Sequence, residues 1–347
     1  MAMATRMADT APLTVLTGFL GAGKTTLLNK LVQRPEMAGT AVLVNEFGEI
    51  GLDHILMDRI EQVGVDDSTI LLPSGCVCCA VRGDLVRALR DLLPRVDSGE
   101  IKRVVVETTG LADPAPIVQT LMGDISIALR YRLDGIVTVV DAVHAMGQFD
   151  DHAEAVRQVA MADRIVLSKT DLPHDTAALR ARMHALNPGA PVIVADHGAV
   201  DPTAILDAGL FDASGKIGDV KRWLNEAAWA MAPTGKPDPN RHDAHIQAFC
   251  LTFDEPLHWQ GIGTCLEMLV GTRGESLLRV KGILNLVGQS RPVAIHGVQH
   301  MFHDPVLLDA WPPGDPKTSR IVFITRDLDR ATIEAGLQAF EAAARGA

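Results

Sequence analysis

The chain has 347 residues, of which 47% are hydrophobic and 22% are charged, and its formal net charge is −11. This length allows two domains with packed cores, whereas the acidic balance and the lack of lysine or arginine runs exclude nucleic acid as a partner. No apolar stretch approaches the ~20 residues that cross a bilayer, and the first residues lack the apolar segment of a signal peptide, so we expect no membrane partner.

Up to about residue 210, short aliphatic strands alternate with helical segments. These strands are apolar throughout, which is typical of a parallel sheet covered on both faces. The pattern therefore predicts an α/β, doubly wound, mostly parallel sheet that binds ligands at the carboxyl ends of its strands. The predicted strands are 13–17, 40–46, 104–107, 135–141, 164–168 and 191–195, and stretches such as 82–96 and 152–162 fit helices.

The pattern changes after a stretch rich in proline. Residues 232–243 read as a linker, which divides the chain into a first domain, 1–231, and a second domain, 244–347. The second domain is predicted to be a smaller α+β unit with an antiparallel sheet. Its predicted strands are 246–253, 277–286, 292–298 and 320–325, and its predicted helices are 259–269 and 328–344.

The first predicted strand runs directly into a glycine-rich loop and then an apolar helical stretch. This segment matches the P-loop pattern G-x-x-x-x-G-K-[ST] in the strand–loop–helix context that the pattern requires. Its backbone N–H groups can surround a β-phosphate at the start of the helix, its lysine can reach the β- and γ-phosphates, and its first threonine can bind Mg²⁺. The predicted nucleotide-binding residues are Gly18, Phe19, Leu20, Gly21, Ala22, Gly23, Lys24, Thr25 and Thr26.

An acidic residue ends the strand 104–107, where phosphoryl transfer needs an acid near the metal. Glu107 can hold Mg²⁺ through water, together with Thr25 of the P-loop, and the backbone N–H of Gly110 can approach the γ-phosphate. An acid at a strand end is otherwise a solvated terminus, and the P-loop favours the metal role. We therefore predict that Lys24 and Glu107 are catalytic and that Thr25 and Glu107 form the magnesium site.

The strand 164–168 ends in Ser168-Lys169-Thr170-Asp171, which fits the [NST]-K-x-D pattern of GTPases. The carboxylate of Asp171 can accept hydrogen bonds from N1–H and the N2 amine of guanine, while the stem of Lys169 packs on the ring. Adenine has no such donor pair, and sites of this kind discriminate strongly. The alternative is an ordinary acid at a helix start. The position of the motif at a strand end favours guanine recognition by Ser168, Lys169 and Asp171.

Three of the five cysteines lie within four residues, at Cys76, Cys78 and Cys79. An odd, clustered set is not a disulfide framework and suits a reducing compartment, so we expect a cytoplasmic protein. Three soft ligands in one tight turn suit Zn²⁺, Co²⁺ or Cu(I) far better than Mg²⁺. The alternative is buried structural cysteine, which is our interpretation of the isolated Cys250 and Cys265.

Five motifs in order give a family resemblance. GFLGAGKTT, NEFGEIGLD, GCVCC, ETTGLADP and SKTD resemble the CobW-type metallochaperone GTPases, which are relatives of the nickel-insertion GTPases for urease and hydrogenase. The resemblance covers nearly the whole chain, since LLRVKGIL (277–284) and RIVFITRDL (320–328) resemble the C-terminal domain of that family.

The resemblance implies roles for two segments between the P-loop and Glu107. Residues 45–53 would be the first nucleotide-responsive switch, and Cys76, Cys78 and Cys79 would bind the transferred metal. Glu49 is a candidate fourth ligand, and a solvated switch-loop carboxylate is the alternative interpretation.

The function implied by the resemblance is a slow GTPase that binds GTP or GDP with Mg²⁺. It would carry Zn²⁺ (or Co²⁺) at the C-x-C-C motif and transfer it to a client metalloprotein under nucleotide control. One alternative is a metal-sensing or buffering GTP-binding protein without productive transfer. Another is a P-loop kinase or ATPase, which leaves SKTD and C-x-C-C unexplained. The client and the oligomeric state stay open, and a homodimer is one option.

Histidine usage departs from part of this family. Some members carry a histidine-rich tract, whereas this chain has only His242 and His245 near the predicted linker, so storage of many metal ions is not expected. His296, His300 and His303 form a looser group, with an i, i+3 pair if the segment is helical. We interpret these three as surface or packing residues rather than as a metal site.

Overall fold

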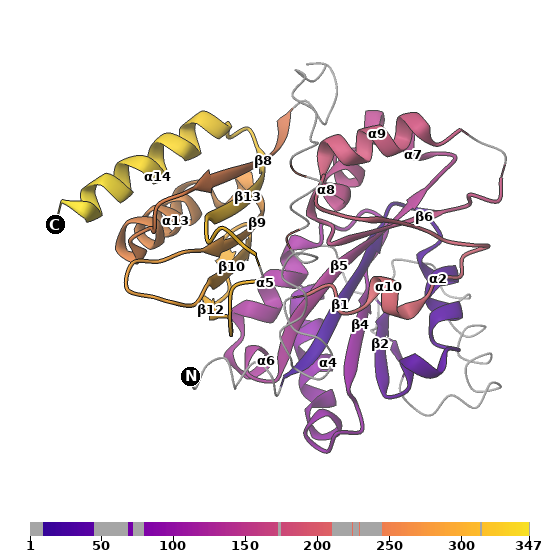
Figure 1. Ribbon diagram of the computed structural model, residues 1–347. Coiled ribbons are helices and arrows are strands. Elements are labelled where there is room, and N and C mark those ends of the chain that lie inside the picture. Colours follow the sequence, from indigo (N-terminus) through magenta and orange to yellow (C-terminus); the bar gives the residue numbers. More distant parts are fainter. Residues whose placement is uncertain are drawn as a thin grey trace.

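The computed structural model describes residues 10–44, 69–71, 80–172, 175–209, 224, 229, 245–312 and 314–346. Two sheets, one from each half of the chain, lie side by side with helices packed around them (Figure 1). The predicted linker 232–243 lies outside the described residues.

The first sheet is parallel, as predicted. In the described part of the chain it has seven strands in the order β3-β2-β4-β1-β5-β6-β7. Strand β3 was not predicted, and β5 begins earlier than expected. The strands are β1 (Ala11–Gly18), β2 (Thr40–Val44), β3 (Thr69–Leu71), β4 (Arg103–Glu107), β5 (Tyr131–Asp141), β6 (Arg164–Ser168) and β7 (Val192–Val194).

Helices cover both faces of this sheet, which confirms the doubly wound fold. Side chains alternate across a strand, so in β4 Val104 and Val106 join the core beneath α4, α5, α7, α8 and α9, and Val105 joins the core beneath α2 and α10. The helices are α2 (Lys24–Leu31), α4 (Ala80–Asp97), α5 (Ala115–Gly123), α6 (Ile125–Ala128), α7 (Ala145–Asp151), α8 (Ala153–Met161), α9 (Ala177–Leu186) and α10 (Pro202–Ile205), with the 3-10 turn η1 (Pro35–Met37).

The second sheet is antiparallel, also as predicted, with the order β11-β10-β9-β13-β8 and with β12 paired to β10. Its Val280, Ile321 and Phe323 face α13 and α14 and form a separate core with them. The elements are β8 (Ile246–Phe253), α13 (Trp259–Arg273), η3 (Gly274–Ser276), β9 (Leu277–Leu284), β10 (Val293–Val298), β11 (Met301–Phe302), β12 (Val306–Leu307), β13 (Ser319–Arg326) and α14 (Arg330–Arg345).

The opposite face of the second sheet packs on the first domain, next to α5, α8 and α9 (Figure 1). Val298 and Ile324 belong to the same buried core as Val159 of α8. This face also carries cations, and their counter-charge comes from the first domain.

That counter-charge is Asp163, between α8 and β6, whose side chain is 1% exposed. Its Oδ1 accepts from Arg279 Nη2 at 2.7 Å and lies 2.6 Å from Lys281 Nζ, both on β9, and its Oδ2 accepts from the N–H of Ile136 at 2.9 Å. Burial alone would raise the pKa of Asp163, but the charges of Arg279 and Lys281 hold it at about 2. An ion cluster therefore joins the two domains.

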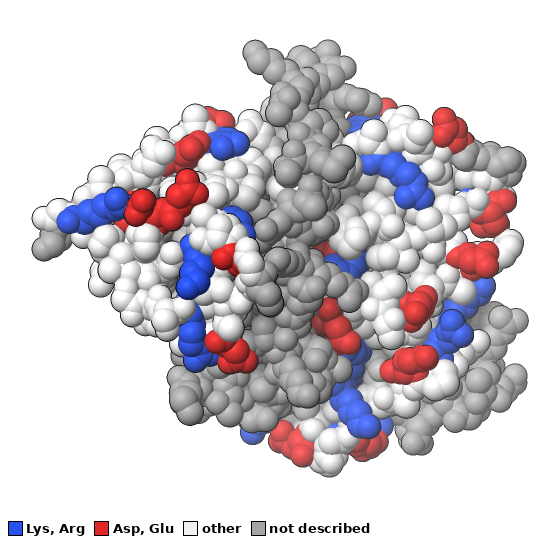
Figure 2. Space-filling model, viewed as in Figure 1, with Lys and Arg blue, Asp and Glu red and all other residues white. Residues whose placement is uncertain are grey.

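The exposed charges are mixed rather than segregated. Figure 2 shows Lys and Arg interspersed with Asp and Glu over the described residues of this face, with no broad single-sign patch among them. In the described part of the chain, no helix has both the length and the apolar composition needed to span a bilayer.

Candidate nucleotide site

The P-loop joins β1 to α2 at the carboxyl edge of the first sheet. Helix α2 begins at Lys24, and its N-cap residue Gly23 supplies no side-chain hydrogen bond, so no side chain competes for the first helical N–H groups. Lys24 is 8% exposed, and its Nζ donates to the carbonyl oxygens of Gly18 at 2.9 Å and Phe19 at 3.3 Å. The ammonium is thus held inside the loop, where a phosphate group would lie.

Gly18 must be glycine for reasons of space and conformation. A Cβ at this position would lie 2.3 Å from the carbonyl oxygen of Val139 in the neighbouring strand β5, and the φ angle of Gly18 is +145°. Both features follow from the sharp departure of the chain from β1 into the loop. The first glycine of the motif is therefore set by the packing of β1 against β5.

Glu107 and Thr25 meet at the mouth of the loop. Glu107 is the last residue of β4, is 3% exposed, and accepts a hydrogen bond from Thr25 Oγ1 at 2.8 Å. Parallel pairing of β1 with β4 sets Leu16 opposite Glu107, which places the carboxylate just before the P-loop. A carboxylate and a hydroxyl are hard oxygen ligands, so this pair fits Mg²⁺.

Gly110 lies directly against the P-loop. A Cβ on Gly110 would come within 2.7 Å of the backbone N and Cα of Leu20, so only glycine allows this approach. Gly110 therefore borders the P-loop, and its contact with the γ-phosphate stays a prediction.

The base-recognition motif is tied to the P-loop as well. Ser168 Oγ donates to the carbonyl oxygen of Ala22 at 2.6 Å, and the Nζ of Lys169 donates to Asp141 Oδ2 at 2.7 Å. Burial would raise the pKa of Asp141, but hydrogen bonds from Lys169 and His144 lower it below its usual value. Asp141 is therefore a carboxylate that holds the ammonium group of Lys169.

Asp171 is partly open to solvent, since its side chain is 34% exposed. Strong discrimination in favour of guanine therefore requires the base itself to cover the carboxylate. His197 Nδ1 lies 3.5 Å from Asp171 Oδ2, and Thr170 Oγ1 donates to the carbonyl oxygen of Ala195 at 3.2 Å. The loop after β7 thus lines this end of the site.

Sequence reasoning missed Asp141 and His197. Asp141 carried a usable signal, because it is an acid at the carboxyl end of a predicted strand next to the P-loop strand. His197 carried none, because its loop has no recognisable motif.

The predicted transition-metal ligands cannot be placed. Glu49, Cys76, Cys78 and Cys79 lie outside the described residues. Among the residues that are described, no group of three or more His, Cys, Asp or Glu side chains could hold a metal ion. Cys250 is half-buried and Cys265 is buried in the second domain, and burial raises the pKa of Cys265 to about 11.

The histidine group in the second domain is not helical. His296 lies on β10 and His303 follows β11, so the conditional i, i+3 pair does not form. The rings of His296 and His303 stack with centroids 3.8 Å apart. Burial lowers the pKa of both, that of His303 to about 3, so the pair is neutral at pH 7. This arrangement is consistent with packing residues.

Comparison with known proteins agrees with this fold. Residues 12–194 match the family described as "CobW/HypB/UreG, nucleotide-binding domain", and residues 246–341 match "Cobalamin synthesis protein cobW C-terminal domain". The chain is 36% identical over 328 residues to "Zinc chaperone YjiA" of Escherichia coli, covering 93% of this chain and 96% of that protein. It is 28% identical over 361 residues to "Zinc-regulated GTPase metalloprotein activator 1" of Saccharomyces cerevisiae, covering 93% and 82%.

A solved structure agrees as well. The crystal structure of Zn(II)-bound YjiA GTPase from E. coli superposes with a TM-score of 0.69 at 31% identity, covering 95% of this chain and 99% of that one. Together with the fold and the P-loop, these findings define the class: the chain is a P-loop GTPase. It belongs to the CobW/HypB/UreG family and carries the CobW C-terminal domain.

A change at Asp171 tests the assignment of the base site. Asp171→Asn should weaken GTP binding by about 10²-fold, because two hydrogen bonds to a charged acceptor are lost. The same variant should bind xanthosine triphosphate better than wild type does, since xanthine presents a carbonyl where guanine presents an amine. Competition against a fluorescent GTP analogue measures both. Asp196→Asn is the control, because that neighbouring side chain is 92% exposed. Equal binding of ATP and GTP by wild type would contradict the assignment.

Proposed function

We propose that this protein is a slow GTPase that binds a transition metal, zinc foremost, at the C-x-C-C motif and delivers it to a client metalloprotein under nucleotide control. Family membership and the names of the relatives support a metallochaperone role. The proposal includes a division at residues 232–243 and a cytoplasmic place of action, where thiols stay reduced.

One observation carries the link between nucleotide and metal. Strand β3 ends at Leu71, which pairs with Val44 of β2, and Val44 pairs in turn with Glu107 of β4. The chain therefore leaves β3 at the sheet edge where the P-loop and Glu107 lie. Cys76 follows only five residues later in the sequence. A metal site in this segment would therefore be connected to a strand that ends at the same edge of the sheet as Glu107.

The chemistry proposed for the nucleotide relies mainly on electrostatics. Lys24 would stabilise charge that develops on the transferred phosphoryl group, and Gly110 would contact the γ-phosphate through its N–H. Thr25 and Glu107 would hold Mg²⁺, which when bound neutralises charge on the β- and γ-phosphate oxygens. Lys169 and Asp171 would select guanine. Because no further acid or base is required, a slow intrinsic rate is expected.

Nucleotide control is useful because thiolate sites hold zinc tightly. Apparent binding energies of roughly 10–16 kcal/mol make spontaneous release slow. A nucleotide-dependent rearrangement near Glu107 and Gly110 would speed transfer. By linkage, zinc must then change GTP affinity by the same factor as GTP changes zinc affinity.

Titration of zinc tests this coupling. Zinc affinity should differ between the GDP state and the state with a nonhydrolysable GTP analogue by about 5- to 150-fold, the usual range of such coupling. Cys78→Ser should abolish tight stoichiometric Zn²⁺ or Co²⁺ binding and leave metal-free GTP binding nearly intact. Cys250→Ser is the matched control, since this half-buried thiol on β8 lies outside the motif. Equal zinc affinity in both nucleotide states would refute the chaperone mechanism.

A release assay separates delivery from sensing. With zinc bound, GTP should accelerate metal transfer to a fluorescent zinc chelator more than the nonhydrolysable analogue does. Equal rates would favour a metal-sensing or buffering protein. Joint loss of stability and GTP affinity in Cys78→Ser would instead indicate that the cysteines serve packing.

A further inference from the structure

Helix α8 lies behind the loop that carries Gly110. Gly110 packs on the backbone of Leu20 on one side, and on the other side its carbonyl oxygen accepts a hydrogen bond from Gln158 of α8 at 3.1 Å. The loop is thus held between the P-loop and this helix. Any movement of the Gly110 loop must therefore displace either the P-loop or α8.

The side-chain amide of Gln158 binds this loop. Its Nε2 donates to the carbonyl oxygens of Gly110 at 3.1 Å and Ala112 at 3.0 Å, and the residue is 1% exposed. Both donors of a buried amide are therefore committed, and losing them leaves two carbonyls without these bonds. The neighbouring Arg157 lies 3.7 Å from Asp113 at the end of the same loop.

The start of α8 also contacts the P-loop. His152, the N-cap residue of α8, stacks on the ring of Phe19 with centroids 4.6 Å apart. Helix α8 therefore touches both the P-loop and the Gly110 loop with side chains on successive turns.

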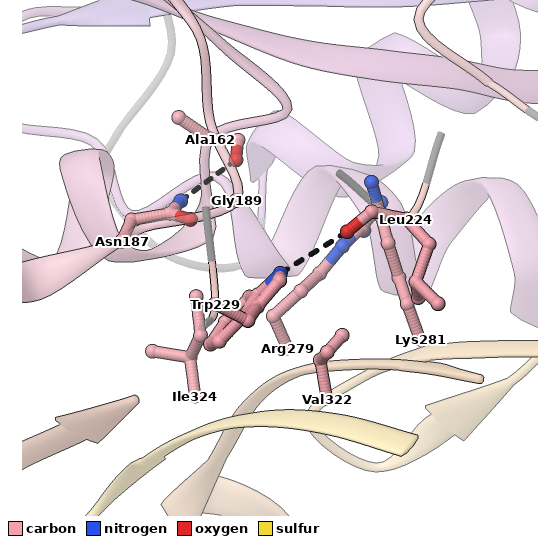
Figure 3. Close-up of a pocket in the computed structure, with 9 residues that line it drawn as sticks. All are labelled: Ala162, Asn187, Gly189, Leu224, Trp229, Arg279, Lys281, Val322 and Ile324. Atoms are coloured by element: carbon pink, nitrogen blue, oxygen red, sulfur yellow. Dashed lines mark hydrogen bonds between the residues drawn. The ribbon is translucent and has the colours of Figure 1, made fainter. Parts of the chain in front are cut away.

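The other end of α8 reaches the second domain. Asn187 Nδ2 donates to the carbonyl oxygens of Val159, Ala160 and Ala162, which fixes the end of the helix. A small crevice of about 20 Å³ lies here, lined by residues of both domains. Figure 3 shows Asn187 and Ala162 on one side of it, with Arg279 and Lys281 of β9 on the other. Asp163, the next residue, makes the ion cluster with those two cations.

We propose that Gln158 is a positioning residue of the nucleotide site and that α8 couples the Gly110 loop to docking of the second domain. This inference rests on the proposed function, in which the Gly110 loop senses the γ-phosphate. Gln158 lies in the last turn of α8, which ends at Met161, and Asp163 follows two residues later. Movement of the loop therefore shifts the end of the helix next to Asp163 or breaks two buried hydrogen bonds. The nucleotide state thereby reaches the domain interface without a flexible connection.

The first experiment removes the two donors and keeps the length of the side chain. In Gln158→Met the preference for a nonhydrolysable GTP analogue over GDP should fall about tenfold, while affinity for GDP changes less than about threefold. Displacement of a fluorescent nucleotide measures both affinities. An unchanged preference overturns the positioning role.

Thr138→Val is the matched control for packing. Thr138 is 1% exposed, and its Oγ1 donates to the backbone carbonyl of Gln158 at 2.7 Å, so the substitution keeps the two hydrogen bonds of the Gln158 side chain. It should leave the nucleotide preference unchanged even if it lowers the urea midpoint of unfolding. An equal loss of preference in Thr138→Val would show that only the stability of α8 matters, which also overturns the proposal.

A double-mutant cycle tests the coupling to the second domain. Lys281→Met alone should change the preference for the GTP analogue by about three- to fivefold. In the Gln158→Met background the same substitution should have no further effect, because the link through α8 is already broken. No effect of Lys281→Met alone, or effects that multiply, would overturn the coupling.

Two further measurements distinguish failure of the proposed function from failure of the inference about α8. If wild type does not bind GTP, or if Gly110→Ala keeps full affinity for the analogue, the loop is not the γ-phosphate sensor and both proposals fall. If Gly110→Ala loses that affinity while Gln158→Met does not, only the inference about α8 fails.

Discussion

Lys24→Ala should reduce the turnover number for GTP hydrolysis by about 10³-fold, because one preorganised cation that stabilises transition-state charge is removed. The lysine is already oriented, since its ammonium is held by the carbonyl oxygens of Gly18 and Phe19 at 2.9 and 3.3 Å. The charge therefore needs little reorganisation when phosphate enters. Phosphate release under saturating GTP and Mg²⁺ measures the effect.

Lys102→Ala is the control for loss of a lysine. Lys102 is exposed and lies just before β4, at the amino end of the strand whose carboxyl end is Glu107. Removal of its side chain should therefore leave turnover unchanged. The folded state of each variant is checked by its urea midpoint. A turnover within about threefold of wild type in Lys24→Ala would move the site of hydrolysis away from this P-loop.

The phosphate end of the site could be predicted because its determinants are local. The P-loop is one continuous segment of fixed spacing, and Glu107 and Ser168 end strands whose parallel pairing brings their carboxyl ends together. A correct assignment of strands was therefore enough to bring these residues to one edge. Their roles in catalysis and base selection stay predictions.

Contacts between side chains of distant elements could not be predicted in the same way. Gln158 carries a weak signal, since it is a polar residue within the apolar stripe of the predicted helix 152–162. Nothing in the sequence says that its amide meets Gly110, 48 residues away. The tie between Lys169 and Asp141 is similar, because it depends on how β5 and β6 pair.

The interface between the domains had no local signal. Asp163 and Arg279 are 116 residues apart, and each looks like an ordinary charge at a strand boundary or within a strand. Alternation along β9 predicts that Arg279 and Lys281 share a face, but it does not say which face is solvated. The structure shows that this face is covered by the first domain.

Asp163→Asn should lower the free energy of unfolding by about 3–5 kcal/mol, the usual cost of removing one member of a buried ion cluster. Arg279 and Lys281 would stay buried without the carboxylate that both contact, and Arg279 Nε and Nη1 already have no hydrogen-bond partner among the described residues. Urea unfolding of the full chain at pH 7 measures the change.

The pH dependence gives a second signature of the same cluster. The pKa of Asp163 is about 2 in the folded protein, below the value of about 3.9 for an unfolded chain. The stabilisation is therefore complete above about pH 4 and is lost as the pH falls through 2, a change of about 2–3 kcal/mol. Wild type should show this loss, and Asp163→Asn should lack it.

A substitution of Lys281 tests whether uncompensated charge causes the loss of stability in Asp163→Asn. Burial lowers the pKa of Lys281 to about 8, so the lysine is charged at pH 7. Between pH 8 and the higher pKa that lysine has in the unfolded chain, loss of this proton makes the folded protein more stable as the pH rises. Adding Lys281→Met to Asp163→Asn should recover part of the lost stability at pH 7, because one buried cation is removed together with its desolvation cost. If the double variant is less stable than Asp163→Asn alone, packing by the lysine stem outweighs its charge, and the loss in Asp163→Asn has another origin.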